Sequence, residues 1–339
     1  STSVDAVRTV MGIKGEPTAP SDPAHGLVWT AIVRQIDSPG SASQFISVAE
    51  TTRAILSRHP WSIAGGGASE LKEMIESAGA QHLRDVADEM GFFGITAADD
   101  IMLGDHQMFH RHEIEEEFVR PIVVGDEVRD WLTLPRSHVL FPYRQENLIA
   151  LDEARNLCRW LWPFRTTLGS RPTFSKKTYF EEGRPWGEWH QIAARRANGL
   201  AITLALVATD NHFVLERGGS AYKQSSPLIK LGSKYDETAH QGILGLLNSS
   251  AGAFWMKQVL HDKGNGGIGG GIASEDWERF YEYTSAGLAE FVLPKSWPTK
   301  VSCELDALAQ ELKTLLAHPV NFGDKQVSHA KLDSIRHHV

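Results

Sequence analysis

The sequence predicts a mixed α+β fold, with a small α/β segment at the N-terminus, a β-rich middle and a helical C-terminal part. Short runs of β-branched and aromatic residues, bounded by Gly, Pro, Asn or Asp, fill residues 91–231 and are typical of strands. From Thr238 the apolar residues return to a helical period. A chain of 339 residues exceeds one ordinary core. This length suggests two domains, or one domain with a long appendage. The changes of pattern place a first segment over 1–90, a β-rich domain over 91–235 and a helical segment that packs on it over 236–339.

The N-terminal segment combines a linker with short regular elements. Residues 1–26 end in a stretch rich in Pro, Gly and Ser, which is typical of a linker, and with no Met at position 1 we expect a fragment. The apolar run LVWTAIVRQI predicts a short strand over 27–36. Apolar residues at helical spacing predict a helix that begins near Ser69, and a second helical stretch over 83–90.

The middle of the chain holds six short apolar runs that we predict as strands. The runs are FFGIT (92–96), PIVVG (121–125), HVLFPY (138–143), ITLALVAT (202–209), HFVLE (212–216) and PLIKL (227–231). Between two of them, the segment ERGGSAY at 216–222 predicts a hairpin turn, because paired glycines accept the backbone angles of such turns.

The C-terminal part is predicted to be helical. Residues 238–264 fit two helices, and Asn248, Ser249 or Ser250 is available to cap the second. A flexible turn follows at GNGGIGGG, and then a helix over 274–283. The last predicted helix covers 303–318 and is amphipathic. Its apolar face consists of Leu305, Leu308, Leu312, Leu315 and Leu316.

The charge of the chain is divided unevenly. The net charge is −8, yet the segment from Arg155 to Lys234 holds 13 Lys and Arg against 5 Asp and Glu. A chain with this division can present a basic face to a polyanion while staying soluble. The alternative is chance clustering of surface charge.

Composition also limits the compartment. No window of about 18 apolar residues occurs, and the N-terminus lacks a signal-peptide pattern, so we expect no membrane association. Cys158 and Cys303 are the only cysteines, which fits a reduced cytoplasm and excludes a cysteine zinc cluster.

The segment HQMFHRHEIEEEF, which begins at His106, raises the question of a metal site. Histidine and carboxylate are metal ligands, but His112 lies about 160° beyond His110 on a helix in which each residue turns ~100°. The three histidines cannot easily converge on one ion, and the segment HEIEEEF reads as a helical, solvated acidic face. We therefore expect a charged surface and no metal here.

Motifs for catalysis and for nucleotide binding are absent. The glycine clusters at 65–67 and 264–271 lack the G-x-G-x-x-G spacing after a strand, and no P-loop occurs. The sequence also lacks an [ND]-P-P-[YFW] loop, H-E-x-x-H and G-x-S-x-G. We expect no catalytic residues and no cofactor in this chain.

The order of several segments resembles the target-recognition domain of adenine-specific DNA methyltransferases. A GIT strand, a segment containing RPIVVGDEVRDW and a strand ending in FPY follow one another at 94–96, 119–131 and 139–143. Further segments of the family pattern lie at 184–196, 201–231, 243–259, 281–294 and 304–312. The resemblance runs from about residue 8 to 316, to PglX-type methyltransferases of BREX phage-defence systems and more distantly to type IIG restriction–modification enzymes.

The resemblance implies that the chain is the specificity half of a cytoplasmic, prokaryotic enzyme that methylates adenine. S-adenosyl-L-methionine (SAM) would bind the parent's catalytic domain, of which VRTVMGIKGEP looks like the end. Double-stranded DNA, that catalytic domain and other phage-defence proteins are the implied partners. Candidate DNA-binding residues are Arg165, Arg171, Lys176, Lys177, Arg184, Arg195, Arg196, Asn211, Lys223 and Lys230. Of these, Arg195, Arg196 and Asn211 are favoured for base reading, because Arg pairs with guanine and Asn with adenine.

Two other functions remain open. A metal-dependent nuclease or hydrolase would need an ion held by residues that are distant in the sequence. A protein-docking module would bind other defence proteins through its acidic ends, and its binding would be insensitive to loss of the basic middle. The ten tryptophans do not decide among these functions, since Trp186, Trp189 and Trp255 fit a core better than a base-stacking role.

Overall fold

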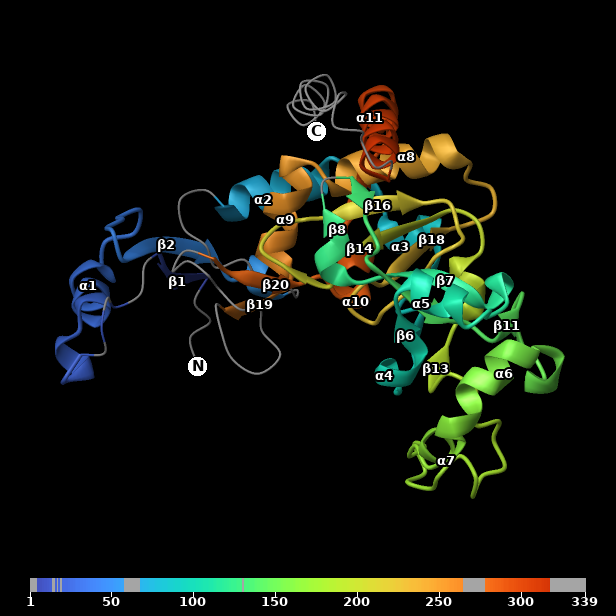
Figure 1. The fold of residues 1–339 in the computed structure, drawn as a ribbon. Helices are drawn as coiled ribbons and strands as arrows, with labels where there is room; N and C mark the ends of the chain where they lie inside the picture. Colours follow the sequence, from blue (N-terminus) through green and yellow to red (C-terminus); the bar gives the residue numbers. More distant parts are fainter. Residues whose placement is uncertain are drawn as a thin grey trace, which may run out of the picture.

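The computed structural model describes residues 5–13, 16, 18, 20–57, 68–129, 131–264 and 278–317. Over these residues the chain has a mixed α+β fold with several small sheets, which confirms the predicted fold class (Figure 1). One hydrophobic core extends from Leu83 to Leu312, and a separate small cluster lies in the N-terminal arm. The three predicted domain boundaries stay a prediction.

The N-terminal arm is a two-stranded antiparallel sheet that carries one helix. Strands β1 (Ala6–Gly12) and β2 (Ile46–Thr52) pair along their whole length, and helix α1 (Leu27–Gln35) packs on them (Figure 1). The strand predicted over 27–36 is therefore wrong. Because Val28, Ala31 and Ile32 follow a helical period, α1 can bury one face against β2.

Two four-stranded sheets form the centre of the main core. The first has the order β16-β14-β18-β4 and the second has the order β17-β7-β10-β6. All four residues of β14 are buried, as expected for a central strand covered on both faces. The strands of the two sheets are β16 (Phe213–Glu216), β14 (Ala201–Leu204), β18 (Leu228–Leu231), β4 (Ala87–Gly91), β17 (Ala221–Tyr222), β7 (Val119–Val123), β10 (Ser137–Leu140) and β6 (Leu103–Gly104).

Short ladders surround these sheets. Two of them join parts of the chain that are far apart in sequence, since β3 pairs with β21 and β5 pairs with β13. The ladders are β3 (Gly79–His82) with β21 (Val292–Pro294), β5 (Gly94–Ile95) with β13 (Gln191–Ile192), β8 (Val128–Arg129) with β9 (Leu132–Thr133), β11 (Tyr143–Arg144) with β12 (Asn147–Leu148), and β20 (Phe280–Glu282) between β15 (Val207–Ala208) and β19 (His261–Gly264).

The C-terminal helices cover one side of the core. Helix α8 (Glu237–Leu247) packs on β14 and β16, and α11 (Thr299–Ala317) packs on α8 (Figure 1). The close approach needs Gly245, because a Cβ at this position would overlap the side chain of Ser302. The predicted helix near Ser69 is confirmed. The remaining helices are α2 (Ala68–Ser77), α3 (Leu83–Val86), α4 (Asp99–Met102), α5 (His106–Arg111), α6 (Arg155–Leu161), α7 (Arg165–Gly169), α9 (Ser250–Val259) and α10 (Ser285–Ala289).

Most predicted strands of the middle and the capping of α9 are confirmed. The Ser249 hydroxyl accepts a hydrogen bond from the Gly252 amide at 3.0 Å and so caps α9. Two other predictions are wrong. The helical stretch over 83–90 ends at Val86, because the next five residues pair with β18, and Phe280–Glu282 is a strand rather than a helix. Residues 65–67 and most of 264–277 lie outside the described residues.

The turn predicted at 216–222 exists but does not close a hairpin. Gly218 and Gly219 have φ angles of 94° and 89°, which fits the turn chemistry. Strand β17 leaves this turn and pairs in parallel with β7 of the second sheet, not with β16. The two glycines thus pass the chain from one central sheet to the other.

A buried histidine predicts how stability depends on pH. His240 is 3% exposed, its Nδ1 donates to the Asp236 carbonyl at 2.7 Å, and within the described residues its Nε2 has no partner. Burial lowers the pKa of His240 below its ordinary value. Below about pH 6.5 the unfolded chain therefore binds a proton that the folded chain excludes, so the stability that His240 supplies at neutral pH is lost as the pH falls.

We expect the free energy of unfolding to fall between pH 7 and pH 5, with a contribution from His240 of at most about 1.4 kcal/mol per pH unit. Urea unfolding at several pH values measures this. His240→Gln removes the titrating group, so the variant should show a shallower dependence than the wild type. Equal slopes for the two proteins would contradict the assignment to His240.

Candidate nucleic-acid interface

A lobe formed by residues 144–188, here called the α6–α7 lobe, projects from the main core (Figure 1). Its base is held by Trp189, which is 2% exposed. The Trp189 amide donates to the Tyr143 hydroxyl at 2.9 Å, and its indole Nε1 donates to the Leu140 carbonyl at 3.0 Å. Burial raises the pKa of Tyr143 well above its ordinary value, so the hydroxyl stays protonated. These bonds fix where the lobe leaves the core.

Arg171 stabilises the interior of the lobe. Its side chain is buried and donates to four backbone carbonyls. The acceptors are Leu168, Thr96, Trp186 and Glu188, at 2.6–2.9 Å. Burial lowers the pKa of Arg171 from its usual value. The donors of this predicted DNA-binding residue are directed inward, so its position fits a structural role.

The surface of the lobe carries five cations without a carboxylate partner among the described residues. They are Arg155, Arg159, Arg165, Lys176 and Lys177. Arg184, in contrast, pairs with Glu188 at 2.5 Å. An unpaired surface cation needs no broken ion pair before it meets a phosphate, so these five are the charges best suited to bind a polyanion.

Exposed aromatic rings accompany these cations. The exposed fractions of Phe174 and Trp162 are 74% and 61%. The Arg165 guanidinium lies 5.6 Å from the ring centre of Trp162 and 5.1 Å from that of Phe180. An exposed ring can stack on a base and a neighbouring guanidinium can bind a phosphate, so this pair of groups suits contact with nucleic acid.

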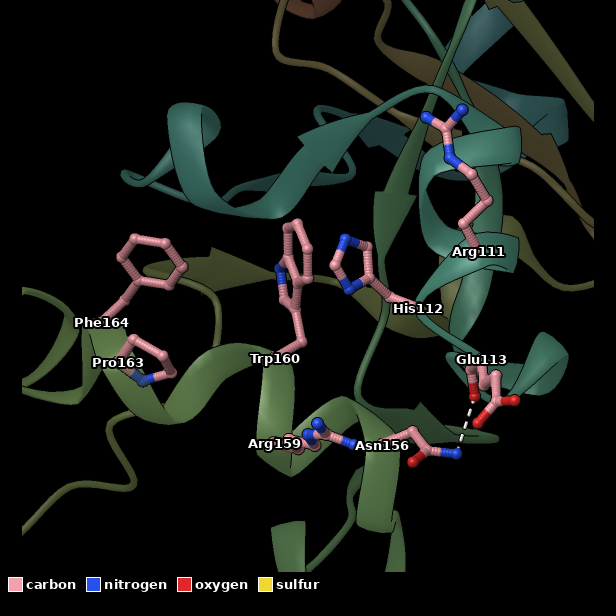
Figure 2. Close-up of a pocket in the computed structure, with 8 residues that line it drawn as sticks. All are labelled: Arg111, His112, Glu113, Asn156, Arg159, Trp160, Pro163 and Phe164. Carbon is pink, nitrogen blue, oxygen red and sulfur yellow. Dashed lines mark hydrogen bonds between the residues drawn. The ribbon is translucent and has the colours of Figure 1, made fainter.

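A hollow of about 500 Å³ lies between α5 and α6, at the junction of the lobe and the core (Figure 2). Trp160 and Phe164 contribute aromatic rings to it, and the His112 ring lies 4.7 Å from that of Trp160. Asn156 closes one side by donating to the Glu113 carbonyl at 2.8 Å. Arg111 and Arg159 also line the hollow. Aromatic and cationic groups therefore continue from the lobe to the surface of α5.

The predicted base-reading arginines share one carboxylate. Arg195 and Arg196 both bond Glu89, at 2.7 and 3.0 Å. The side chain of Arg196 is only 20% exposed and also donates to the Phe92 carbonyl, whereas that of Arg195 is 63% exposed. Lys230 donates to the carbonyls of Arg195 and Asn198, which holds the same turn in place. Among Arg195, Arg196 and Lys230, only Arg195 has a guanidinium or ammonium group that is largely accessible to solvent.

Two other predicted residues also have partners within the chain. The Asn211 side-chain amide donates to the carbonyls of Leu247 and Ser249 at 2.6 and 3.2 Å, and so closes the end of α8. Lys223 pairs with Asp99 at 2.7 Å. The structure therefore gathers Arg165, Lys176, Lys177 and Arg184 in one lobe and places the other predicted residues elsewhere or inside it.

The histidines of the segment that begins at His106 point to different neighbours. His106 meets Glu116 at 2.9 Å and lies 4.8 Å from the His138 ring, whereas His112 lies against Trp160. Helix α5 ends at Arg111, and the helical stretch predicted beyond it shrinks to a 3-10 turn at Glu116–Phe118. Within the described residues, no group of three or more His, Cys, Asp or Glu could hold a metal ion.

Sequence reasoning missed Arg111, Arg155, Arg159 and Phe174 as surface candidates. Arg155 and Arg159 lie one helical turn apart on α6, a spacing that the sequence contains but that does not reveal which face is open. Phe174 reads as an ordinary core residue in the sequence. The three arginines are candidates because they are exposed and form no ion pair among the described residues, and Phe174 because it is exposed. Both properties can be read only from the three-dimensional structure.

The chain is thus an α+β module with a lobe that carries exposed cations and aromatic rings. Known proteins similar to it were found by sequence and by structure. No protein-family model matches the chain. Over 312 residues it is 45% identical to the adenine-specific methyltransferase PglX of Streptomyces coelicolor, a match that covers 90% of this chain and 26% of PglX. The resemblance to PglX-type methyltransferases is thus confirmed, and the chain spans about a quarter of the length of that relative.

Two solved structures are also similar. The type IIL restriction–modification enzyme MmeI in complex with DNA matches 75% of this chain and 33% of its own, with a TM-score of 0.45 and 14% identity. The type IIG restriction endonuclease BpuSI matches 99% of this chain and 40% of its own, with a TM-score of 0.46 and 10% identity. In the part of the chain that the structure describes, no helix combines the length and apolar character needed to cross a membrane.

Proposed function

We propose that this chain is the DNA-recognition part of an adenine-specific DNA methyltransferase and that it holds double-stranded DNA against the α6–α7 lobe. The observation that carries the proposal is the group of five cations without carboxylate partners beside exposed aromatic rings, on a chain 45% identical to PglX. Elsewhere in the basic middle, Arg195, Arg196 and Lys223 form ion pairs. The lobe therefore holds most of the cations of the basic middle that are not already in an ion pair.

In this proposal the lobe supplies affinity and register through phosphate contacts, which carry little sequence information. Arg195 is the candidate for a base contact, since its head is accessible and Arg pairs bidentately with guanine. A separate catalytic domain with SAM would methylate an adenine turned out of the duplex. This chain lacks the sequence motifs that hold SAM, so no step of that chemistry is assigned to it.

The proposal places the parent enzyme in cytoplasmic phage defence of the BREX type, with further defence proteins as partners. Docking to such proteins remains the second candidate for this chain. The two functions differ in their response to salt. Phosphate contacts release counterions, so DNA affinity falls steeply as salt rises, whereas docking through the acidic ends does not require the basic lobe.

The direct test is fluorescence anisotropy of the purified chain with labelled duplex at several salt concentrations. If most of the five cations contact phosphate, the logarithm of the association constant should fall with the logarithm of salt concentration with a slope of about −3 to −5. A docking module would give no measurable duplex binding even at low salt. That result would overturn the proposal.

A further inference from the structure

The most exposed aromatic side chain of the described residues sits on a short loop of the α6–α7 lobe. Phe174 is 74% exposed, and its ring lies 5.1 Å from that of His190, centre to centre, with the two planes tilted by 46°. Burying a Phe side chain contributes about 1.5–3 kcal/mol, so a ring held in water forgoes most of this stabilisation. A single exposed ring is common on protein surfaces, so its meaning here depends on the loop that holds it and on the charges beside it.

The loop around Phe174 is held by its own hydrogen bonds. The Thr173 amide donates to the Lys177 carbonyl at 2.7 Å, and the Lys176 amide donates back to the Thr173 carbonyl at 3.0 Å. Lys176 adopts a φ of 64°, which closes the turn tightly. The Thr173 hydroxyl donates to Glu182 at 2.8 Å, and the Ser175 hydroxyl also donates to this carboxylate. The ring is therefore displayed on a fixed turn.

The charges of this loop favour a polyanion. Within the described residues neither Lys176 nor Lys177 forms an ion pair, although Lys177 interacts electrostatically with Glu181 and Glu182, and both lysines follow Phe174 within three residues. The nearby acids are directed to the loop itself, since Glu181 accepts from the Thr178 amide at 2.6 Å. Hydrogen bonds from Ser175 and Thr173 lower the pKa of Glu182, which holds this carboxylate in its structural role.

We propose that Phe174 is a wedge that enters between two base pairs of bound DNA while Lys176 and Lys177 hold the adjacent phosphates. This inference rests on the proposed function and adds a position and an action to it. Apolar side chains presented on a basic surface can insert between base steps, partly unstack them and kink the duplex. A fixed turn suits this action, because the loop loses little conformational freedom when the ring enters the stack.

The test measures DNA unwinding, because a side chain inserted between base pairs untwists the duplex. Closed circular plasmid is relaxed by a topoisomerase in the presence of the purified chain, and the linking number is read on a gel after the protein is removed. A plasmid offers many sequences, so the recognised site need not be known. The wild type should shift the linking number, and Phe174→Ala should lose the shift while it still binds plasmid. Phe174→Leu should retain it, since leucine is also an effective wedge.

Trp29→Ala is the matched control, because Trp29 is a 51% exposed aromatic on α1 in the N-terminal arm, far from the lobe (Figure 1). It should leave the shift unchanged. A Phe174→Ala variant that unwinds plasmid like the wild type overturns the wedge. So does a wild type that binds plasmid without unwinding it, and in that case the proposed DNA recognition survives. A wild type that fails to bind duplex at low salt overturns both.

Discussion

Replacing Arg171 with alanine is expected to lower the free energy of unfolding by about 3–5 kcal/mol. The substitution leaves the carbonyls of Leu168, Thr96, Trp186 and Glu188 without their donor, and hydrogen bonds from a charged group are worth about 1.5–3 kcal/mol each. Not all of this is lost, since water enters the lobe when the side chain is removed. Urea unfolding gives the free energy, and limited proteolysis shows where the chain opens.

In the Arg171→Ala variant, unfolding should begin in the α6–α7 lobe. The first new proteolytic cleavage sites should therefore fall within 144–188. Arg171→Lys should rescue little, because a compact ammonium cannot reproduce the planar set of donors of a guanidinium. Arg165→Ala is the control from the same lobe. Its head is exposed, has no carboxylate partner among the described residues and contacts only the rings of Trp162 and Phe180, so its effect should stay within about 1 kcal/mol. Comparable losses for both variants would contradict the structural role of Arg171.

Removing three lobe cations together is expected to weaken duplex binding by roughly 100-fold at about 0.1 M salt. The variant is Arg165→Gln with Lys176→Gln and Lys177→Gln. Each phosphate contact contributes about one unit to the salt slope, so the slope should become shallower by about three if all three residues touch phosphate. Anisotropy titrations at several salt concentrations measure both the affinity and the slope.

A matched triple variant separates local contacts from net charge. Arg34→Gln with Lys295→Gln and Lys300→Gln also removes three exposed cations, but none of them belongs to the lobe. It should keep nearly the wild-type affinity and slope. If the two triple variants weaken binding equally, the effect comes from overall charge, and the lobe is not the DNA-binding surface.

Local pattern was enough to predict most of the regular core. The runs that became β7, β10, β14, β16 and β18 carry β-branched residues and clear ends, so they were recognisable without tertiary information. The failure at 27–36 has a physical cause. Ten residues of mostly apolar sequence satisfy a strand and a two-turn helix about equally, and the outcome was decided by contact with β2.

For the candidate interface, too, the sequence predicted the general location but not the contacts of individual residues. The count of charges predicted a basic middle over 155–234, and most of the lobe lies within it. The sequence could not reveal that Glu89, more than a hundred residues earlier, pairs with Arg195 and Arg196, nor that Arg171 faces inward. Ion pairing and burial are set by long-range packing, so residue type and spacing identify a basic segment but not its accessible charges.

The bonds between Trp189 and both Tyr143 and Leu140 bring the two ends of the α6–α7 lobe together at a buried anchor. The lobe also meets the core along α6 and α7, where Leu157, Leu161 and Leu168 join the main hydrophobic core and Arg171 donates to the Thr96 carbonyl. Changes in length and composition are therefore expected to be tolerated at the exposed turn around Phe174, and not along the whole lobe. A graft that replaces only residues 173–177 between relatives should preserve the fold.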